Sequence, residues 1–234
     1  MPAPQKPKPD DARIAAVIER LKSKATTKDL EGMARYAIPS DKAFGVAMNK
    51  IQKLAKELGK DHELAAALWE SGWYEARILA GYVDEPARVT PAQMDRWCRD
   101  FDNWAICDSI CFALFKRVPF AWDKVRAWAT KKDEFGKRGA FALIWALAGS
   151  ADEDEPFYEA LPLIEAAATD ERNFVKKSVD MALRAIGKRS LALNKAAVAT
   201  AKKLVKSADT TAMWIGKHAL KELESEAVRK RLGD

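Results

Sequence analysis

The hydrophobic and polar positions of this chain follow a helical period along almost its whole length. In the segment 103–116 the apolar residues recur at Ile106, Cys107, Ile110, Cys111 and Leu114, which is the spacing of one helix face. Alternating patterns typical of strands are almost absent, and glycine and proline fall between the helical blocks. The pattern predicts an all-α fold. The expected helices span 11–24, 28–36, 43–58, 61–70, 72–82, 91–100, 103–116, 121–130, 134–148, 156–168, 172–187, 191–205, 210–219 and 222–232.

Helices that begin with an aromatic residue recur along the chain. These residues are Trp73, Trp104, Phe135, Phe174 and Trp214, at successive spacings of 31, 31, 39 and 40 residues. A further helix is expected before each of the last four. This arrangement predicts stacked antiparallel helix pairs, an α-solenoid of HEAT-like units that forms a single domain over 11–234 with a concave basic groove.

A charged residue follows each aromatic residue by three or four positions. If the second helix of each pair lines the groove, these residues form a row that suits a phosphate backbone. One member of the row is an acid, Asp108. Phosphates would repel it, so Asp108 would lower the affinity for a phosphate backbone unless it takes part in catalysis. Asn103 is expected to cap its helix, and Trp104 lies one turn before Asp108 on the same side. The row consists of Arg77, Asp108, Arg138, Lys177 and Lys217.

Each of these residues also has a purely structural interpretation. Trp104 could fill the gap between two helices, as most tryptophans of an α-helical protein do. Asp108 could be a solvated helix residue or form a local ion pair, and the cations could be ordinary surface charge. Packing alone does not predict their shared register, and this register favours the functional interpretation.

The charge of the chain is uneven. The 234 residues carry a formal net charge of +6, and residues 170–234 hold 15 Lys and Arg against 8 Asp and Glu. The basic C-terminal part suggests a polyanionic partner. Residues 1–10 are rich in proline and lysine and lack an apolar core, which predicts a disordered tail and no signal peptide. The longest predominantly apolar stretch, 139–151, is too short to span a bilayer.

Cysteine and histidine usage narrows the chemistry further. Cys98, Cys107 and Cys111 form no C-x-x-C pair and lie in apolar helical contexts, which predicts buried free thiols in a reducing, cytoplasmic compartment. The chain has two histidines, so a multi-histidine metal site is not expected. Nucleotide-binding, zinc-protease and nucleophile-elbow motifs are absent. No metal and no cofactor are expected.

Several short motifs resemble those of one known family. The chain is similar to the AlkD-type DNA alkylation-repair glycosylases, which are HEAT-like-repeat proteins, over residues 28–232. The Asn-Trp-x-x-x-Asp element together with the basic helix starts is the most specific part. The matching pieces are Met33-Ala-Arg-Tyr36 before Gly45-Val46, Asn103-Trp104-x-x-x-Asp108, Lys137-Arg138-x-Ala140, Phe174-Val-Lys-Lys177-x-Val179 and Ala182-Leu183-Arg184.

The resemblance implies hydrolysis of the N-glycosidic bond of N3- or N7-alkylated purines in duplex DNA. Trp104, Asp108 and Arg138 would surround the lesion nucleotide and act in catalysis. At Met181 the chain departs from the family, which has a second groove tryptophan there, and this departure would change the rate or the substrate range. The remaining residues that would contact DNA are Tyr36, Lys137, Lys176, Lys177, Met181, Arg184 and Lys217.

The expected chemistry also suits the residues themselves. An alkylated purine is already cationic and departs without a general acid, which leaves an oxocarbenium-like sugar. Asp108 could stabilise this positive charge and position the attacking water. Trp104 could offer its π face to the cationic nucleotide, worth up to ~2 kcal/mol when desolvated. Arg138 could hold a flanking phosphate.

Two other functions remain open from the sequence. A non-catalytic relative could bind the shape of branched or damaged DNA, which the methionine at position 181 favours. A HEAT-type scaffold for protein interactions would bind DNA weakly and without salt dependence, whereas both DNA-directed functions predict affinity that falls steeply with salt. The leading hypothesis is a monomeric, nucleoid-associated glycosylase that acts on duplex DNA without contact to membranes.

Overall fold

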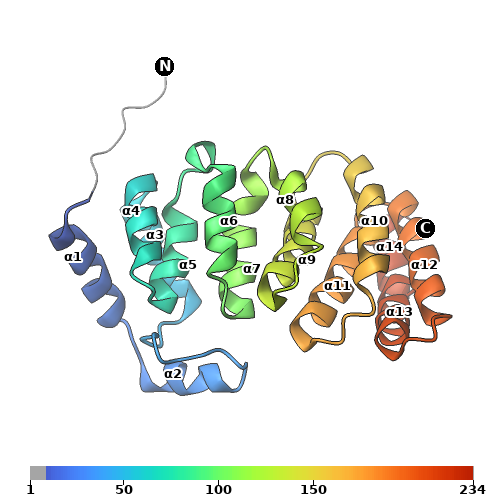
Figure 1. The fold of residues 1–234 in the computed structure, drawn as a ribbon, viewed down its shortest axis with the longest axis horizontal. Helices are drawn as coiled ribbons and strands as arrows, with labels where there is room; N and C mark the ends of the chain where they lie inside the picture. The colour runs from blue at the N-terminus through green and yellow to red at the C-terminus, as the bar shows by residue number, and fades with distance from the viewer. Residues whose placement is uncertain (1–8, 234) are drawn as a thin grey trace. The chain divides into compact units, whose positions relative to one another are not determined.

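The computed structural model describes residues 9–233 and contains in that range fourteen α-helices, two short 3-10 helices and no strand (Figure 1). The predicted all-α fold is confirmed. The predicted tail lies outside the described residues except for Pro9 and Asp10, and the Asp10 side chain accepts from the Arg13 N–H at the start of the first helix. The chain divides into two compact units. One contains the residues up to Trp97 with Asp102–Val118, and the other contains Cys98–Phe101 with the residues from Pro119 onward.

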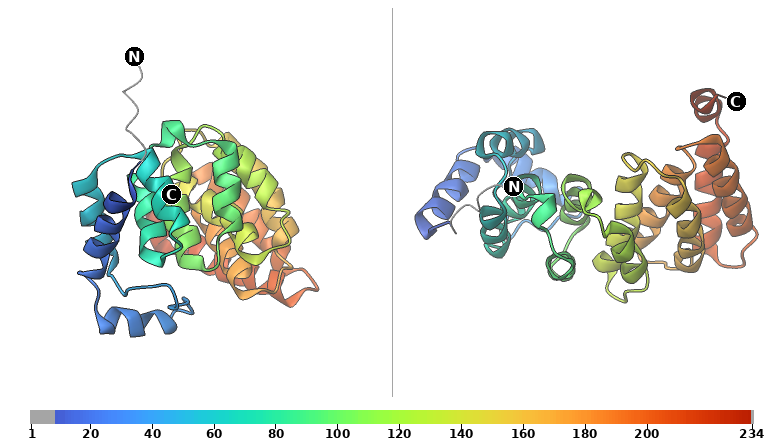
Figure 2. Two further views of the ribbon diagram at one scale, coloured as in Figure 1. Left: turned by 60° about the vertical axis from the view of Figure 1, so that its left-hand side comes forward. Right: turned by 90° about the horizontal axis from the view of Figure 1, so that it is seen from above.

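The first unit is built around α5, which packs against α3, α4 and α7. Its core contains two stacked indole rings, those of Trp69 and Trp97, whose centroids are 4.1 Å apart. Both side chains are fully buried. In Figures 1 and 2, α2 lies crosswise at one end of the neighbouring helices of this unit. The elements are α1 (Asp11–Lys22), α2 (Thr27–Ala34), α3 (Met48–Leu58), α4 (His62–Glu70), α5 (Tyr74–Val83), η1 (Pro86–Arg88), α6 (Pro91–Arg99), α7 (Trp104–Ala113) and η2 (Phe115–Arg117).

The start of α3 differs from the prediction. A helix was expected from residue 43, but α3 begins at Met48. Gly45 has a φ of +81°, a left-handed conformation that favours glycine and interrupts a helix. The backbone N–H groups of Phe44, Gly45 and Val46 all donate to the carboxylate of Glu75 on α5. This contact between distant residues holds the segment in a non-helical path.

The second unit is a stack of antiparallel helices. Helix α11 packs against α9 and α13, and α12 packs against α13. Figure 2 shows these helices, coloured from yellow-green to red, side by side in both views. Asp133, Ser190 and Asp209 each accept a backbone N–H at the start of a helix, α9, α12 and α13 respectively. The elements are α8 (Ala121–Trp128), α9 (Glu134–Ala148), α10 (Glu155–Ala167), α11 (Asn173–Ile186), α12 (Leu191–Val205), α13 (Thr210–Leu223) and α14 (Glu226–Leu232).

The boundary between the last two helices also differs from the prediction. The expected helices 210–219 and 222–232 are found as α13, which continues to Leu223, and α14, which begins at Glu226. Ser225 caps α14 by accepting the N–H of Val228. Glu222 pairs with Arg184 of α11 and with Lys188, which follows the end of α11, and these pairs favour continuation of α13 by one turn. Gly216 allows the close approach of α13 to α12, since a Cβ there would lie 2.6 Å from the Ala201 carbonyl oxygen.

All three cysteines are buried thiols outside any disulfide bond, as expected. Within residues 9–233, no helix combines the length and the apolar composition needed to cross a membrane. The same described residues contain no group of three or more His, Cys, Asp or Glu side chains placed to hold a metal ion.

Candidate functional site

The start of α7 carries the Asn-Trp-x-x-x-Asp element. Asn103 caps the helix as predicted, because its side-chain oxygen accepts the N–H of Ile106 at 3.0 Å. Its side-chain N–H₂ donates to Asp102 at 2.7 Å, and the residue is buried. These bonds fix the orientation of the cap. Trp104 therefore begins the helix and Asp108 lies one turn further along.

Trp104 and Asp108 lie on the outward side of α7. Both residues are half-buried, whereas Ala105, Ile106 and Cys107 between them are buried. The predicted common face is thus confirmed. The arrangement places a carboxylate one turn from an aromatic ring, a combination that can stabilise a neighbouring positive charge.

The structure brings Tyr36 to this helix start. The indole Nε1–H of Trp104 donates to the carbonyl oxygen of Tyr36 at 2.7 Å, although the two residues are 68 positions apart in the sequence. The Tyr36 side chain is 65% exposed and is therefore available to a ligand. The chain turns at once after it, because Ala37 adopts a φ of +52°.

The loop 36–47, which follows α2 and leads into α3, is fastened to α5 at several points. The Glu75 carboxylate is fully buried and accepts the three N–H groups of residues 44–46 at 2.7–3.2 Å. The N–H of Tyr74 donates to the Lys42 carbonyl at 2.8 Å. Burial raises the pKa of the Tyr74 hydroxyl, and the Glu75 charge adds to this effect. These contacts hold the loop against α5 and thereby position Tyr36.

A pocket of about 190 Å³ lies beside this helix start. It is formed where the loop 39–42 meets the beginnings of α5 and α7, and it reaches the capping residue Asn103. The pocket was not predicted from the sequence, because it depends on the loop path that Gly45 and Glu75 set. Its lining residues are Pro39, Asp41, Lys42, Gly72, Tyr74, Asp102, Asn103 and Ile106.

Arg77, the first member of the predicted row, is held inside the first unit. Its guanidinium lies over the ring of Trp69 with its carbon 5.1 Å from the ring centroid, and its Nη1 is 3.7 Å from Asp102. Its side chain is 17% exposed. The contacts favour a structural role, in which Arg77 joins α5 to the start of α7.

The second unit contains Arg138 and the remaining predicted DNA-binding residues. Arg138 is 3% exposed, and its Nη1 donates to the Phe174 carbonyl oxygen at 2.8 Å. Its neighbour Lys137 pairs with Asp170 at 3.0 Å. The Arg172 guanidinium also binds Asp170 and, with Lys137, holds the pKa of that carboxyl at about 2. Lys137 is therefore already paired with a carboxylate within the protein.

The cations of α11 and α13 fall into two groups. Arg184 pairs with Asp180 at 2.9 Å and also with Glu222, whereas Lys177 and Lys217 are exposed. Met181 is half-buried on α11. Lys176 lies with its Nζ 4.9 Å from the ring centroid of Trp214. The exposed lysines are the members of the predicted set that remain open to a phosphate.

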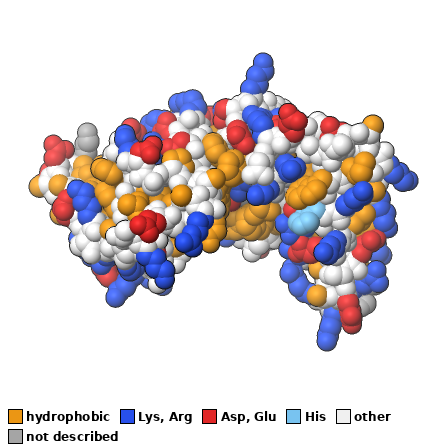
Figure 3. Space-filling view, turned by 90° about the horizontal axis from the view of Figure 1, so that it is seen from below, with side chains coloured by type: hydrophobic (Ala, Val, Ile, Leu, Met, Phe, Trp, Pro, Cys, Tyr) orange, Lys and Arg blue, Asp and Glu red, His pale blue; other side chains and the backbone are white. Residues whose placement is uncertain are grey.

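His218, near these lysines, was not predicted as part of a site. His218 stacks on the ring of Trp214, and its Nδ1 lies 2.9 Å from Asp180. The Trp214-x-x-x-His218 spacing, which places two rings on one face of a helix, was the available sequence signal. Figure 3 shows a histidine between hydrophobic and basic side chains on the underside of the C-terminal part.

Comparison with known proteins gives a family and a related fold. The sequence profile of the family described as DNA alkylation repair enzyme matches residues 17–223. A solved structure described as "a new family of proteins related to the HEAT-like repeat DNA glycosylases with affinity for branched DNA structures" superposes with a TM-score of 0.77 at 21% identity, over 94% of this chain and 96% of the other. An engineered protein gives a TM-score of 0.42 at 16% identity, over 93% and 62%. No curated protein sequence matches the chain. The first structural likeness shows that the predicted HEAT-like repeat fold is correct.

Proposed function

Because the chain belongs to the DNA alkylation repair enzyme family, we propose that it is a DNA glycosylase acting on duplex DNA. The proposed reaction is hydrolysis of the N-glycosidic bond of an N3- or N7-alkylated purine. One observation carries the proposal. Trp104 is locked against the Tyr36 carbonyl at the capped start of α7, and Asp108 lies one turn further along on the same face. This arrangement combines an oriented aromatic ring with a carboxylate.

The proposed reaction needs few protein groups. Alkylation has already placed a positive charge on the purine, so the C1′–N bond breaks with its electron pair going to the base, which becomes neutral. Positive charge then develops on the deoxyribose. The Asp108 carboxylate stabilises this charge, orients the water that attacks C1′ and accepts its proton. Trp104 packs against the same nucleotide and adds a cation–π attraction.

The cations of the second unit are proposed to bind the backbone of the same duplex. Lys177 and Lys217 are exposed, which supports phosphate contacts that fix position without reading sequence. The family resemblance implies a phosphate contact for Arg138, but its side chain is buried and donates to the Phe174 carbonyl oxygen, which favours a supporting role for Arg138. Lys137 and Arg184 are paired with carboxylates, and this pairing favours a supporting role over direct contact.

The alternative is a protein that binds DNA shape without cleaving the glycosidic bond. Met181, half-buried on α11, stands where the resemblance implies an aromatic residue, and the related solved structure is described as having affinity for branched DNA. The decisive test incubates the purified protein with a duplex containing 7-methylguanine and measures both the free base and a mobility shift. A glycosylase releases base, whereas a shape-binding protein shifts the duplex and releases none.

A further inference from the structure

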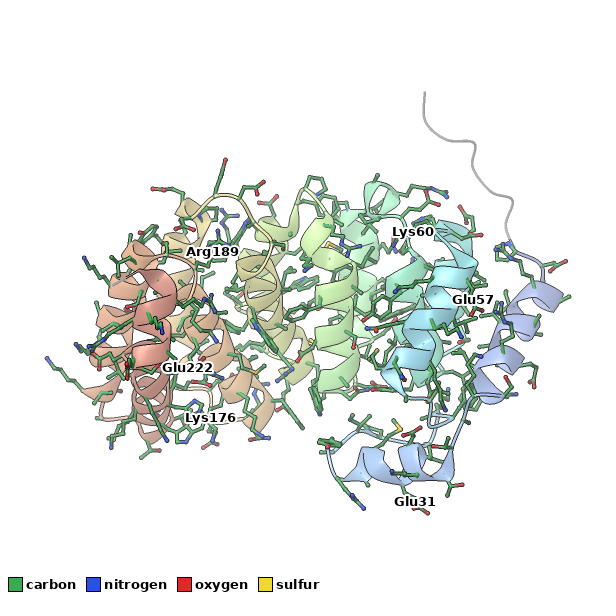
Figure 4. All side chains as sticks on the ribbon, turned by 180° about the vertical axis from the view of Figure 1, so that it is seen from behind. Glu31, Glu57, Lys60, Lys176, Arg189 and Glu222 are labelled. Atoms are coloured by element: carbon green, nitrogen blue, oxygen red, sulfur yellow. The ribbon has the colours of Figure 1, made fainter. Side chains whose placement is uncertain are left out.

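A compact group of side chains on α11 and α13 lies in the second unit. We call this group the Trp214 cluster and define it as Lys176, Asp180, Trp214, Lys217 and His218. Figure 4 labels Lys176 toward one end of this helix pair and Glu222 further along it. The cluster has no part in the chemistry proposed for Asp108.

The histidine of the cluster is held in a fixed orientation. Asp180 is 2% exposed, and its Oδ1 lies 2.9 Å from the His218 Nδ1. A carboxylate only accepts hydrogen bonds, so the proton of this bond is placed on the His218 Nδ1. The Nε2 is then left for another partner, and the His218 side chain is 45% exposed. A buried carboxylate that orients an accessible imidazole is an arrangement that proteins use to bind ligands.

Trp214 is an exposed tryptophan in a polar setting. Its side chain is 39% exposed, and its ring stacks on His218 at a centroid distance of 5.0 Å and an interplanar angle of 8°. The Lys176 Nζ lies 4.9 Å from the same ring. The Trp214 ring thus lies between two groups that can carry positive charge. Leaving this apolar ring exposed to water is unfavourable, and core packing does not explain its position.

The charges around the cluster leave it basic. The Asp180 carboxylate forms an ion pair with Arg184, and the Glu222 carboxylate forms ion pairs with Arg184 and Lys188. Among the described residues, neither Lys176 nor Lys217 forms an ion pair. The outer edge of the cluster therefore presents two ammonium groups and the imidazole around an exposed aromatic surface. This arrangement suits an anionic ligand.

We propose that the Trp214 cluster binds a phosphodiester group of the nucleic-acid backbone. Lys176 and Lys217 supply the charge. A phosphate oxygen would accept a hydrogen bond from the His218 Nε2, on the side of the ring that faces away from Asp180. Trp214 packs on the adjoining sugar or on an unstacked base, as aromatic residues do in single-strand binding. The inference rests on the proposed function only in taking the ligand to be nucleic acid.

The test uses undamaged DNA, so that it does not depend on base release. Affinity for a fluorescent duplex is measured by anisotropy over a range of NaCl concentrations. Each phosphate contact contributes ~0.9 to the slope of log affinity against log salt. We expect Lys176→Gln to lower the slope by ~0.9 and the double variant with Lys217→Gln by ~1.8. Trp214→Ala should weaken binding about fivefold or more with little change in slope.

The matched control is Lys195→Gln, which removes an exposed lysine from α12. Slopes for the cluster variants equal to that of the control would overturn the proposal. Loss of binding to a poly-glutamate peptide without loss of DNA binding would also overturn it, because the cluster would then be a site for acidic protein. Thermal melting followed by circular dichroism establishes that each variant is folded. If the slopes change but the wild type releases no alkylated base, the result supports phosphate binding by the Trp214 cluster and contradicts the glycosylase proposal.

Discussion

The indole Nε1–H of Trp104 donates a 2.7 Å hydrogen bond to the carbonyl oxygen of Tyr36. This bond ties the loop after α2 to the first turn of α7, and it orients the one tryptophan that precedes Asp108 by a helical turn. The loop is in turn bound to α5 through Glu75. The candidate site of the first unit therefore depends on contacts between three segments that are distant in the sequence.

Replacing Trp104 with phenylalanine tests this bond. The Trp104→Phe variant keeps an aromatic ring but loses the donor, so we expect the free energy of unfolding to fall by about 1 kcal/mol. We also expect slower base release from alkylated DNA, because the ring is no longer fixed. Urea denaturation and a base-release assay measure the two effects. Trp122→Phe is the control, since Trp122 is a half-buried ring that packs on Phe157, and equal losses of base release in both variants would contradict a specific role for the Tyr36 contact.

The buried carboxylate of Glu75 allows a second prediction. Glu75→Gln keeps the shape but places an amide N–H₂ against the N–H groups of residues 44–46. Because hydrogen bonds to charged groups contribute more than neutral ones, we expect a loss of about 2–3 kcal/mol in the free energy of unfolding. Glu57→Gln is the matched control, since Glu57 forms an exposed pair with Arg20 and should cost no more than ~1 kcal/mol. A loss in Glu75→Gln as small as that of the control would show that the carboxylate does not anchor the loop.

Asp170 predicts a pH dependence of stability in the second unit. Its folded-state pKa is about 2, below the ordinary 3.8, because Arg172 and Lys137 bind it. A lowered pKa gives stability that is present above the ordinary value and lost as pH falls toward the folded value. Asp170→Asn should therefore be less stable than the wild type at neutral pH, and the difference should shrink between about pH 4 and pH 2. Urea midpoints across this range measure it, and a difference independent of pH would argue against the ion pairs.

Lys137 and Lys177 should behave differently although both were predicted to contact DNA. Lys177 is exposed, so Lys177→Gln should lower the salt slope of DNA binding by ~0.9. Lys137 pairs with Asp170, so Lys137→Gln should leave the slope nearly unchanged and lower the melting temperature instead. Anisotropy titrations and thermal melts separate the two effects. A slope change in Lys137→Gln as large as that in Lys177→Gln would show that Lys137 exchanges Asp170 for phosphate.

Local signals predicted much of the fold and part of the site. The helical period of the apolar residues predicted the helices, because an amphipathic helix face is visible in the local sequence pattern. Asn103, as a capping residue, predicted the start of α7. The four-residue spacing of Trp104 and Asp108 predicted that they share a helix face. These features depend on neighbours within one or two turns.

Features that depend on distant residues were not predictable. The late start of α3 results from Glu75, which lies some 30 residues from the N–H groups it binds. The bond from Trp104 to Tyr36 has no local signature. Lys137 and Lys177 have similar sequence contexts, but only Lys137 pairs with Asp170. The sequence alone does not tell which lysine of a basic helix start already has a carboxylate partner.

The most direct test of the central claim compares base release by the wild type and by Asp108→Asn. Both are incubated in excess over a duplex containing 7-methylguanine, and free base is measured against time, with DNA affinity measured in parallel. The account predicts that the wild type releases the base and that Asp108→Asn does not, while its affinity for DNA is equal or higher because a negative charge near phosphates is removed. Full release by Asp108→Asn would contradict the account.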